Sequence, residues 1–451
     1  MRKLLFFISV FITVSVFSFN LGGSVDSYFL TGSNYQDITF SIGHEGNNFN
    51  FFADLKAIND GKYKPSHPSV YYGNFYFFMK DGGMSLYNDF FRLNTGRINK
   101  KDPADSPYSL FLSSKENSAV SLDFSYEDDT FLYNTTYMEL NKDSVLGYPD
   151  RGANYKHYGI KFGNLRVMYQ ESVVYVGEAF DTEYFINPIP TFFIQYVNSS
   201  SGKPWTHGSN ANAIMGFLSD YKTENMYIYG QILVDDFNMN RFLLPEGSQN
   251  PDKLAVSSGF KIRNGNGFLG IYGAAATKYT FEPYGGYGVN TKYGYTFYPD
   301  TVYLIDNKEM IIENEDNYIG YYNGENNLSF MFDYDYSGDI VKSYSSFEYS
   351  ISGSKSPANP WHEYINWTEG GQGTKFLDDS VLENKIVFKS NLKFTINKFL
   401  DINNSLSVGY VKNKLELVSG TAEDENSVKY FRPSDNNEFI FKYGIGFKFV
   451  F

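Results

Sequence analysis

The sequence of 451 residues predicts an all-β protein. Its expected fold is a single antiparallel transmembrane β-barrel of about 16–18 strands, with short periplasmic turns and long outer loops. Three observations support this prediction: the chain starts like a secretory signal, 19% of its residues are aromatic, and apolar residues repeatedly alternate with polar ones. Successive side chains of a strand point to opposite faces, so this alternation gives one face for lipid and another for water.

The N-terminal residues, 1–18, are expected to be a cleaved signal peptide. Met1-Arg2-Lys3 is cationic, residues 4–17 are apolar apart from small hydroxyl residues, and a serine follows at position 18. A helix needs about 20 apolar residues to span a bilayer, and no later segment approaches that length. Residues 19–451 are therefore expected to form one barrel in the outer membrane of a double-membraned bacterium.

The composition agrees with a barrel and argues against several other classes. The 40 Tyr and 43 Phe residues would supply the aromatic girdles at the two membrane interfaces. The net charge of −13, with no cluster of Lys and Arg, argues against binding of nucleic acid. Because the chain has no cysteine, disulfides, thiolate metal sites and cysteine nucleophiles are excluded. We expect no cofactor.

The last strand has the clearest pattern. From Phe439 to Phe451, large apolar side chains occupy the odd positions and mainly Lys or Gly lies between them. A transmembrane strand needs about 9–11 residues, which this segment provides. A final strand that ends in an aromatic residue is typical of the strand by which outer-membrane barrels are recognised for assembly. The expected partners are thus outer-membrane lipid and, through the strand ending at Phe451, the barrel-assembly machinery.

Earlier segments predict hairpins separated by long connections. Tight turns are expected at 127–129, 163–164, 224–225, 264–267 and near Asp401. The other connections are long and rich in Gly, Pro, Asn, Asp and Ser: 95–118, 177–184, 198–210, 238–253, 281–317, 354–383 and 420–437. Alternation of short and long connections is typical of a barrel with short inner turns and long outer loops.

Between Gly152 and Phe237 the chain has more than alternation. Its characteristic pieces, in order, are 157–163, an aromatic-Glu strand at 169–175, an Asn-Pro turn at 184–188, 215–220, and a strand at 227–237 that ends in Asp-Asp-Phe. In this order they resemble the Wzi-type capsule-assembly proteins of the outer membrane. The resemblance implies a barrel of about 18 strands that does not conduct freely and binds acidic capsular polysaccharide at its outer face. Capsular or extracellular polysaccharide is therefore an expected partner.

Asp235 and Asp236, at the end of this last strand, are the sharpest local feature. Adjacent residues on a strand point to opposite sides, so only one carboxylate faces the lumen unless a bulge turns the other inward. Both are candidates for contact with a glycan or a cation. The alternative is a structural role, as an interior ion pair or a strand-end cap, for which Lys161, Arg166 and Arg241 are near in sequence.

Glu171 is a further candidate for glycan contact. It lies in mid-strand between Tyr169 and Val173 and faces opposite to Gln170. Its partner is expected inside the barrel if the neighbouring side chains lie outside. As for Asp235, the alternative is a structural ion pair.

The predicted loops contain a structural turn and a group of candidate aromatics. Asn187-Pro188-Ile189-Pro190 is expected to fix the backbone direction at a strand end, because proline sets φ and lacks a donor. Aromatic faces stack on sugars while neighbouring Asn and Asp bind hydroxyls. The candidates are Trp205, Trp361, Tyr284 and Tyr287, and their alternative role is anchoring at the membrane interface.

Catalysis has little support in the sequence. The five histidines are far apart and have no metal-ligand spacing. The predicted function is a non-catalytic barrel that binds or tethers surface polysaccharide through its outer loops. The alternative is a general diffusion porin, because a barrel of about 16–18 strands can enclose an aqueous lumen. An outer-membrane barrel hydrolase is the third possibility, since Ser and Asp are abundant.

Overall fold

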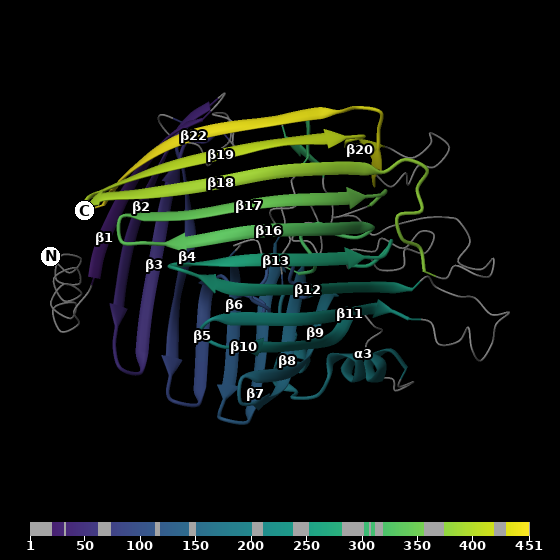
Figure 1. The fold of residues 1–451 in the computed structure, drawn as a ribbon. Coiled ribbons are helices and arrows are strands. Elements are labelled where there is room, and N and C mark those ends of the chain that lie inside the picture. Colours follow the sequence, from purple (N-terminus) through teal and green to yellow (C-terminus); the bar gives the residue numbers. More distant parts are fainter. Residues whose placement is uncertain are drawn as a thin grey trace.

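The computed structural model describes residues 20–30, 33–61, 74–112, 118–143, 150–200, 211–237, 252–281, 302–305, 308–311, 319–355, 374–418 and 430–450 (Figure 1). Eighteen of its strands form one closed antiparallel sheet. Each barrel strand pairs with the next along the chain, and the ring closes where β22 pairs with β1, in the register Ser24↔Val450. The fold is thus an all-β barrel with the upper number of strands that the sequence predicted.

The barrel strands, in chain order, are β1 (Asn20–Leu30), β2 (Ser33–Glu45), β3 (Phe49–Ile58), β4 (Tyr76–Tyr87), β5 (Phe91–Ile98), β6 (Ala119–Glu127), β7 (Phe131–Asn141), β8 (Arg151–Phe162), β9 (Leu165–Val176), β10 (Ala211–Lys222), β11 (Met226–Asp236), β12 (Lys253–Asn264), β13 (Gly267–Ala276), β16 (Asn327–Ser337), β17 (Val341–Ser352), β18 (Glu383–Asn397), β19 (Leu400–Lys412) and β22 (Glu438–Val450). Two short hairpins lie outside the ring: β14 (Val302–Ile305) with β15 (Lys308–Ile311), and β20 (Leu415–Val418) with β21 (Tyr430–Pro433).

The connections differ between the two ends of the barrel. At the end where β22 finishes they contain two or three residues, as at 46–48, 163–164 and 398–399. Gly163 and Gly265 have φ of 61° and 60°, which two-residue hairpin turns require. Long connections, such as 99–118 and 177–210, lie at the opposite end. The predicted alternation is therefore confirmed.

Several expected boundaries differ from the structure. The connection expected from residue 95 begins after Ile98, where β5 ends, and the one expected from residue 420 begins after Lys412, where β19 ends. The turn expected near Asp401 lies at 398–399, because β18 continues only to Asn397 and β19 begins at Leu400. The expected connections 177–184 and 198–210 are parts of one connection between β9 and β10, which contains the helices α2 (Thr182–Ile186) and α3 (Thr191–Ser200). Among the described residues, no helix is long and apolar enough to cross a bilayer.

The two faces of the barrel wall have different compositions. On β11, Tyr227, Tyr229 and Gln231 are buried toward the lumen, whereas Ile228 and Ile232 are 43% and 53% exposed on the outside. On β22, Phe441 and Phe449 are exposed outward, while Nζ of Lys448 lies 3.6 Å from a carboxylate oxygen of Asp26 inside. The facing predicted for the last strand is confirmed.

The main hydrophobic core lies inside the barrel rather than between two layers. It combines inward side chains of β7 to β16 with residues of the connection between β5 and β6, among them Tyr108, Leu110 and Phe111, which are fully buried. The core therefore fills one side of the lumen.

We predict that a positive charge on the outer wall destabilises the barrel more than a change in the lumen does. Phe388 of β18 is 40% exposed outward, and Phe388→Arg should lower the free energy of unfolding by about 2–4 kcal/mol, because the charge would face hydrocarbon. Lys389→Gln, on the adjacent inward position, is the control and should change it little. Urea unfolding in phospholipid vesicles measures both, and equal effects would contradict the assigned faces.

Candidate functional site in the barrel lumen

The connection between β5 and β6 crosses the lumen. We call its described part before β6, residues 99–112, the luminal segment. Its Tyr108 hydroxyl donates a hydrogen bond of 2.9 Å to Oε1 of Glu348 on β17. Half of the ring of eighteen strands separates β6 from β17, so this contact joins opposite walls. The segment therefore spans the barrel interior.

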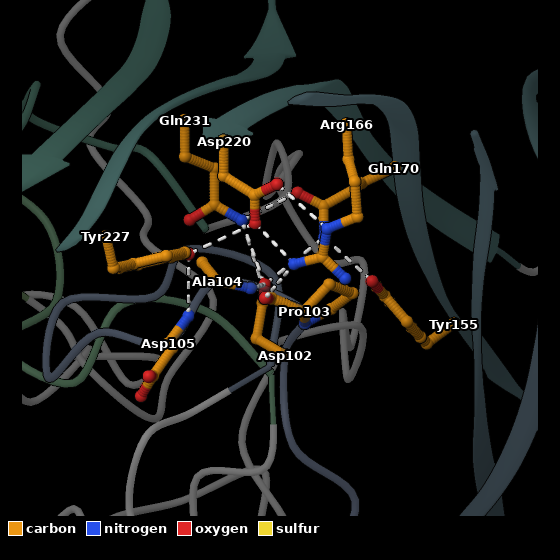
Figure 2. A network of polar contacts seen from close by, with 10 residues as sticks. All are labelled: Asp102, Pro103, Ala104, Asp105, Tyr155, Arg166, Gln170, Asp220, Tyr227 and Gln231. Carbon is orange, nitrogen blue, oxygen red and sulfur yellow. Dashed lines mark hydrogen bonds and ion pairs between the residues drawn. The ribbon is translucent and has the colours of Figure 1, made fainter. Parts of the chain in front are cut away.

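Asp102 anchors the luminal segment to the wall. Its carboxylate is buried and accepts hydrogen bonds of 2.9 to 3.3 Å from five groups, most of them drawn in Figure 2. The donors are the backbone N–H groups of Ala104, Phe111 and Leu112 and the side-chain amides of Gln170 and Gln231. Burial raises the pKa of Asp102, and the hydrogen bonds oppose this rise. One carboxylate thus fixes both the shape of the segment and its position against β9 and β11.

An ion pair between a half-buried arginine and a buried aspartate forms a second anchor beside the first. Arg166 of β9 contacts Asp220 of β10 through two hydrogen bonds, one of them 2.8 Å from Nε, and its guanidinium also lies 3.4 Å from the carbonyl oxygen of Pro103. Tyr227 donates to Asp220 at 3.2 Å and accepts from the backbone N–H of Asp105 at 3.0 Å (Figure 2). Arg166 therefore contacts the luminal segment directly at Pro103, and Asp220 contacts it through Tyr227.

Stacked tyrosines fill the space between the luminal segment and the far wall. The ring of Tyr108 stacks on Tyr322 with centroids 5.8 Å apart and meets Tyr321 edge-on at 5.6 Å. Tyr322 also hydrogen-bonds to Glu348. Burial raises the pKa of Tyr108 and Tyr322, so both phenols stay protonated and act as donors. Residues 319–326, which carry two of these rings, are thus a second inward segment.

A polar cavity remains in the lumen near the short turns. Its volume is about 450 Å³, and it lies against the inner wall of β16 to β19, β22 and β1. The residues lining it include Tyr28, Lys342, Tyr344, Asn391, Lys393 and Asn403. Asp335 also lines the cavity, and Nζ of Lys393 lies 2.7 Å from a carboxylate oxygen of Asp401. Such a mixture of polar groups beside aromatic rings is suited to a polyhydroxylated ligand.

Asp235 faces the lumen, and a β-bulge accompanies it. The register between β11 and β12 shifts between Val234 and Asp236. The Asp235 side chain is 1% exposed and lies 4.0 Å from Nζ of Lys253, and it accepts a hydrogen bond of 2.9 Å from the backbone N–H of Phe281. In this geometry Asp235 ties the end of β11 to residue 281.

Two of the three charged partners expected for Asp235 are wrong, and the third is not tested. Arg166 pairs with Asp220, and Lys161 lies 3.0 Å from Glu127, whereas Arg241 lies outside the described residues. Lys253 is near instead because it is the first residue of β12, the next strand along the chain, which pairs with β11.

Glu171 lies on the outer face of the wall, not in the lumen. It shares that face with Tyr169 and Val173, while Gln170 points inward to Asp102. Its carboxylate accepts hydrogen bonds from the backbone N–H and hydroxyl of Thr191 at 2.7 and 2.9 Å. The condition for a partner inside the barrel is therefore not met, because the neighbouring Gln170 faces the lumen. A helix of the connection between β9 and β10 covers this part of the wall instead.

The other candidates fall into two groups. Trp205, Trp361, Tyr284 and Tyr287 lie outside the described residues. The turn Asn187–Pro190 lies between α2 and α3, with Asn187 as the C-cap of α2, and not at a strand end as expected.

Sequence reasoning missed Asp102, because no local pattern separates it from the other 50 of the 51 acidic residues in the chain.

Comparisons with known proteins give the class of the fold. No protein-family model and no curated protein matches this sequence. The solved structure of Wzi, described as an outer-membrane protein involved in group 1 capsule assembly in Escherichia coli and as a carbohydrate-binding β-barrel, matches with a TM-score of 0.51 and 13% identity over 99% of this chain and 87% of Wzi. The fold is that of an outer-membrane β-barrel.

Two channel structures are similar at a lower level. OccAB4 of Acinetobacter baumannii matches with a TM-score of 0.45 and 9% identity over 96% of this chain and 98% of its own. OprD of Pseudomonas aeruginosa matches with a TM-score of 0.46 and 7% identity over 96% and 95% of the two chains.

We predict that Asp102→Asn loosens the luminal segment. The amide keeps one acceptor oxygen but turns an N–H group toward bound donors, which should cost about 1–3 kcal/mol of local stability. Trypsin should then cleave after Lys100, which mass spectrometry of the refolded protein detects. Asp129→Asn, in the exposed turn at 128–130, is the matched control and should leave this bond protected. Equal protection in both variants would contradict the anchoring role.

Proposed function

We propose that this protein resides in the outer membrane as an occluded barrel that binds surface or capsular polysaccharide at its loop end and holds the polymer at the cell surface without catalysis. The supporting observation is the hydrogen bond between Tyr108 and Glu348, because it joins the luminal segment to the wall opposite its origin. A lumen crossed in this way is unsuited to free diffusion. In this proposal the polysaccharide binds to the surface at the loop end of the barrel and not within the lumen.

One further feature supports a carbohydrate ligand. The fold is shared with Wzi, whose structure is described as carbohydrate-binding. The luminal cavity lies near the short turns, at the end opposite the long loops, so it is not part of the proposed binding surface. Within this proposal, residues 1–18 are the signal peptide and the strand that ends at Phe451 contacts the assembly machinery.

A diffusion porin is the rival function, and conductance separates the two. We expect the wild-type protein in a planar bilayer to show no large, steady open steps, because the luminal segment blocks the direct path. Replacing residues 101–112 with a short Gly-Ser linker should produce such steps. Deleting 240–249 from the connection between β11 and β12 is the control and should not. Large steps in the wild-type protein would favour the porin.

The aromatic candidates are tested by glycan retention. We expect the protein to be retained on an immobilised uronic-acid polysaccharide more than on neutral dextran. Trp361→Ala should weaken retention several-fold, since an aromatic stacking contact contributes about 0.5–1.5 kcal/mol. Asp235→Asn, at a buried position, should change thermal stability rather than retention. Unchanged retention by Trp361→Ala would remove that residue from the binding site, and heat-modifiable migration in gels confirms that each variant is folded.

A further inference from the structure

Polar side chains occupy outward positions on β7, β8 and β9. On these strands the lumen-facing residues are identified by their contacts, for example Gln170 with Asp102. The opposite face holds Thr135, Asn154, Lys156 and Glu171, which are cross-strand neighbours or lie one pair apart. Lys156 and Glu171 are 0% and 1% exposed. Charged groups on the lipid-facing side of a barrel are costly, so a covering element is required.

The connection between β9 and β10 provides this cover. We call residues 178–200, which include α2 and α3, the outer strap. Lys156 donates to the carbonyl oxygens of Asn187 and Ile189 at 2.7 and 3.3 Å, and Glu171 accepts from Thr191 at the start of α3. A carboxylate at a helix N-terminus also meets the positive end of the helix dipole. The two charged side chains therefore bind the strap within its central turn and directly after it.

Two neutral side chains extend the attachment toward α2. The hydroxyl of Thr135 donates to the carbonyl oxygen of Phe185 at 3.1 Å, and the amide of Asn154 donates to that of Tyr184 at 3.0 Å. The ring of Tyr184 stacks on Tyr175 of the wall with centroids 5.4 Å apart. The strap thus covers a length of the strands, because Glu171 lies inside β9 and not at its end.

The exposed large side chains of the strap between Ile186 and Phe193 are apolar, whereas Glu178 and Glu183, nearer to β9, are exposed and charged. Ile186, Ile189, Phe192 and Phe193 are 67%, 46%, 46% and 55% exposed. The sequence of α3, TFFIQYVNSS, contains no charged residue. Below the strap the wall itself is apolar on the outside, with Val167 40% and Phe217 58% exposed. Strap and wall therefore offer one continuous apolar surface.

We propose that the outer strap is a lipid-contacting element, with Ile186, Ile189, Phe192 and Phe193 lying among the acyl chains of the outer leaflet. It replaces the apolar belt where the wall of β7 to β9 carries polar groups. The lipid is favoured over a protein partner because the apolar surface of the strap continues into the surface of the barrel that faces the bilayer. This inference rests on the membrane location proposed above.

Site-directed spin labelling tests the proposal, since the chain contains no native cysteine. Phe193→Cys carries a nitroxide label in protein reconstituted into phosphatidylcholine vesicles, and its collision rates with oxygen and with a water-soluble nickel chelate are compared. Phe217→Cys on the outer wall is the lipid reference, and Asp129→Cys in the exposed short turn is the aqueous reference. We expect the oxygen-to-nickel ratio at residue 193 to be close to that at 217 and several times that at 129.

The references distinguish two kinds of failure. If residue 217 is in lipid and residue 193 has the aqueous ratio, the strap proposal is overturned while the membrane location stands. If residues 217 and 193 both have the aqueous ratio, the proposed membrane location fails. A label at Ile189→Cys provides a second position on the strap, should Phe193→Cys fail to fold, and is expected to give the same lipid-like ratio.

Discussion

The closed ring of backbone hydrogen bonds is the constraint on which the structure depends. A strand edge exposed to hydrocarbon would leave its N–H and C=O groups unpaired, so a sheet can enter lipid only as a closed barrel. Here the ring closes through β22 and β1. Closure divides every strand into an outer and an inner face, and this division produces the two-residue periodicity, the apolar exterior and the separate interior.

The interior holds one group of buried charges. Asp102 is surrounded by donors from its own segment and from two strands, while Arg166 and Asp220 neutralise each other within the wall. Such groups are stable in a low-dielectric interior only when each one is paired or hydrogen-bonded. The same contacts position the luminal segment across the barrel, so the groups that stabilise the interior also occlude it.

The same requirement for hydrogen-bond partners holds on the outer side of the wall, where the outer strap covers charged side chains. Lys156 and Glu171 would face lipid, but the backbone of the strap supplies their hydrogen-bond partners. Occlusion inside and coverage outside both depend on connections from the loop end of the barrel. That end therefore supplies both the segment inside the lumen and the cover outside the wall, whereas the connections at the other end are short turns.

The sequence by itself determined the barrel, because side-chain alternation and turn residues are local properties: the facing of Phe441 and Lys448 and the turn at Gly163 could be predicted from neighbours along the chain. It also singled out Asp235 and the possibility of a bulge. Only the tertiary structure decided the partners. Lys253, not Arg166, is the cation near Asp235, because the bulged register between β11 and β12 brings the first residue of β12 close to it. Asp102 accepts hydrogen bonds from donors far away in sequence. Glu171 faces outward beneath a helix. Alternation in the sequence separates the two faces of a strand, but it does not show which face another segment covers.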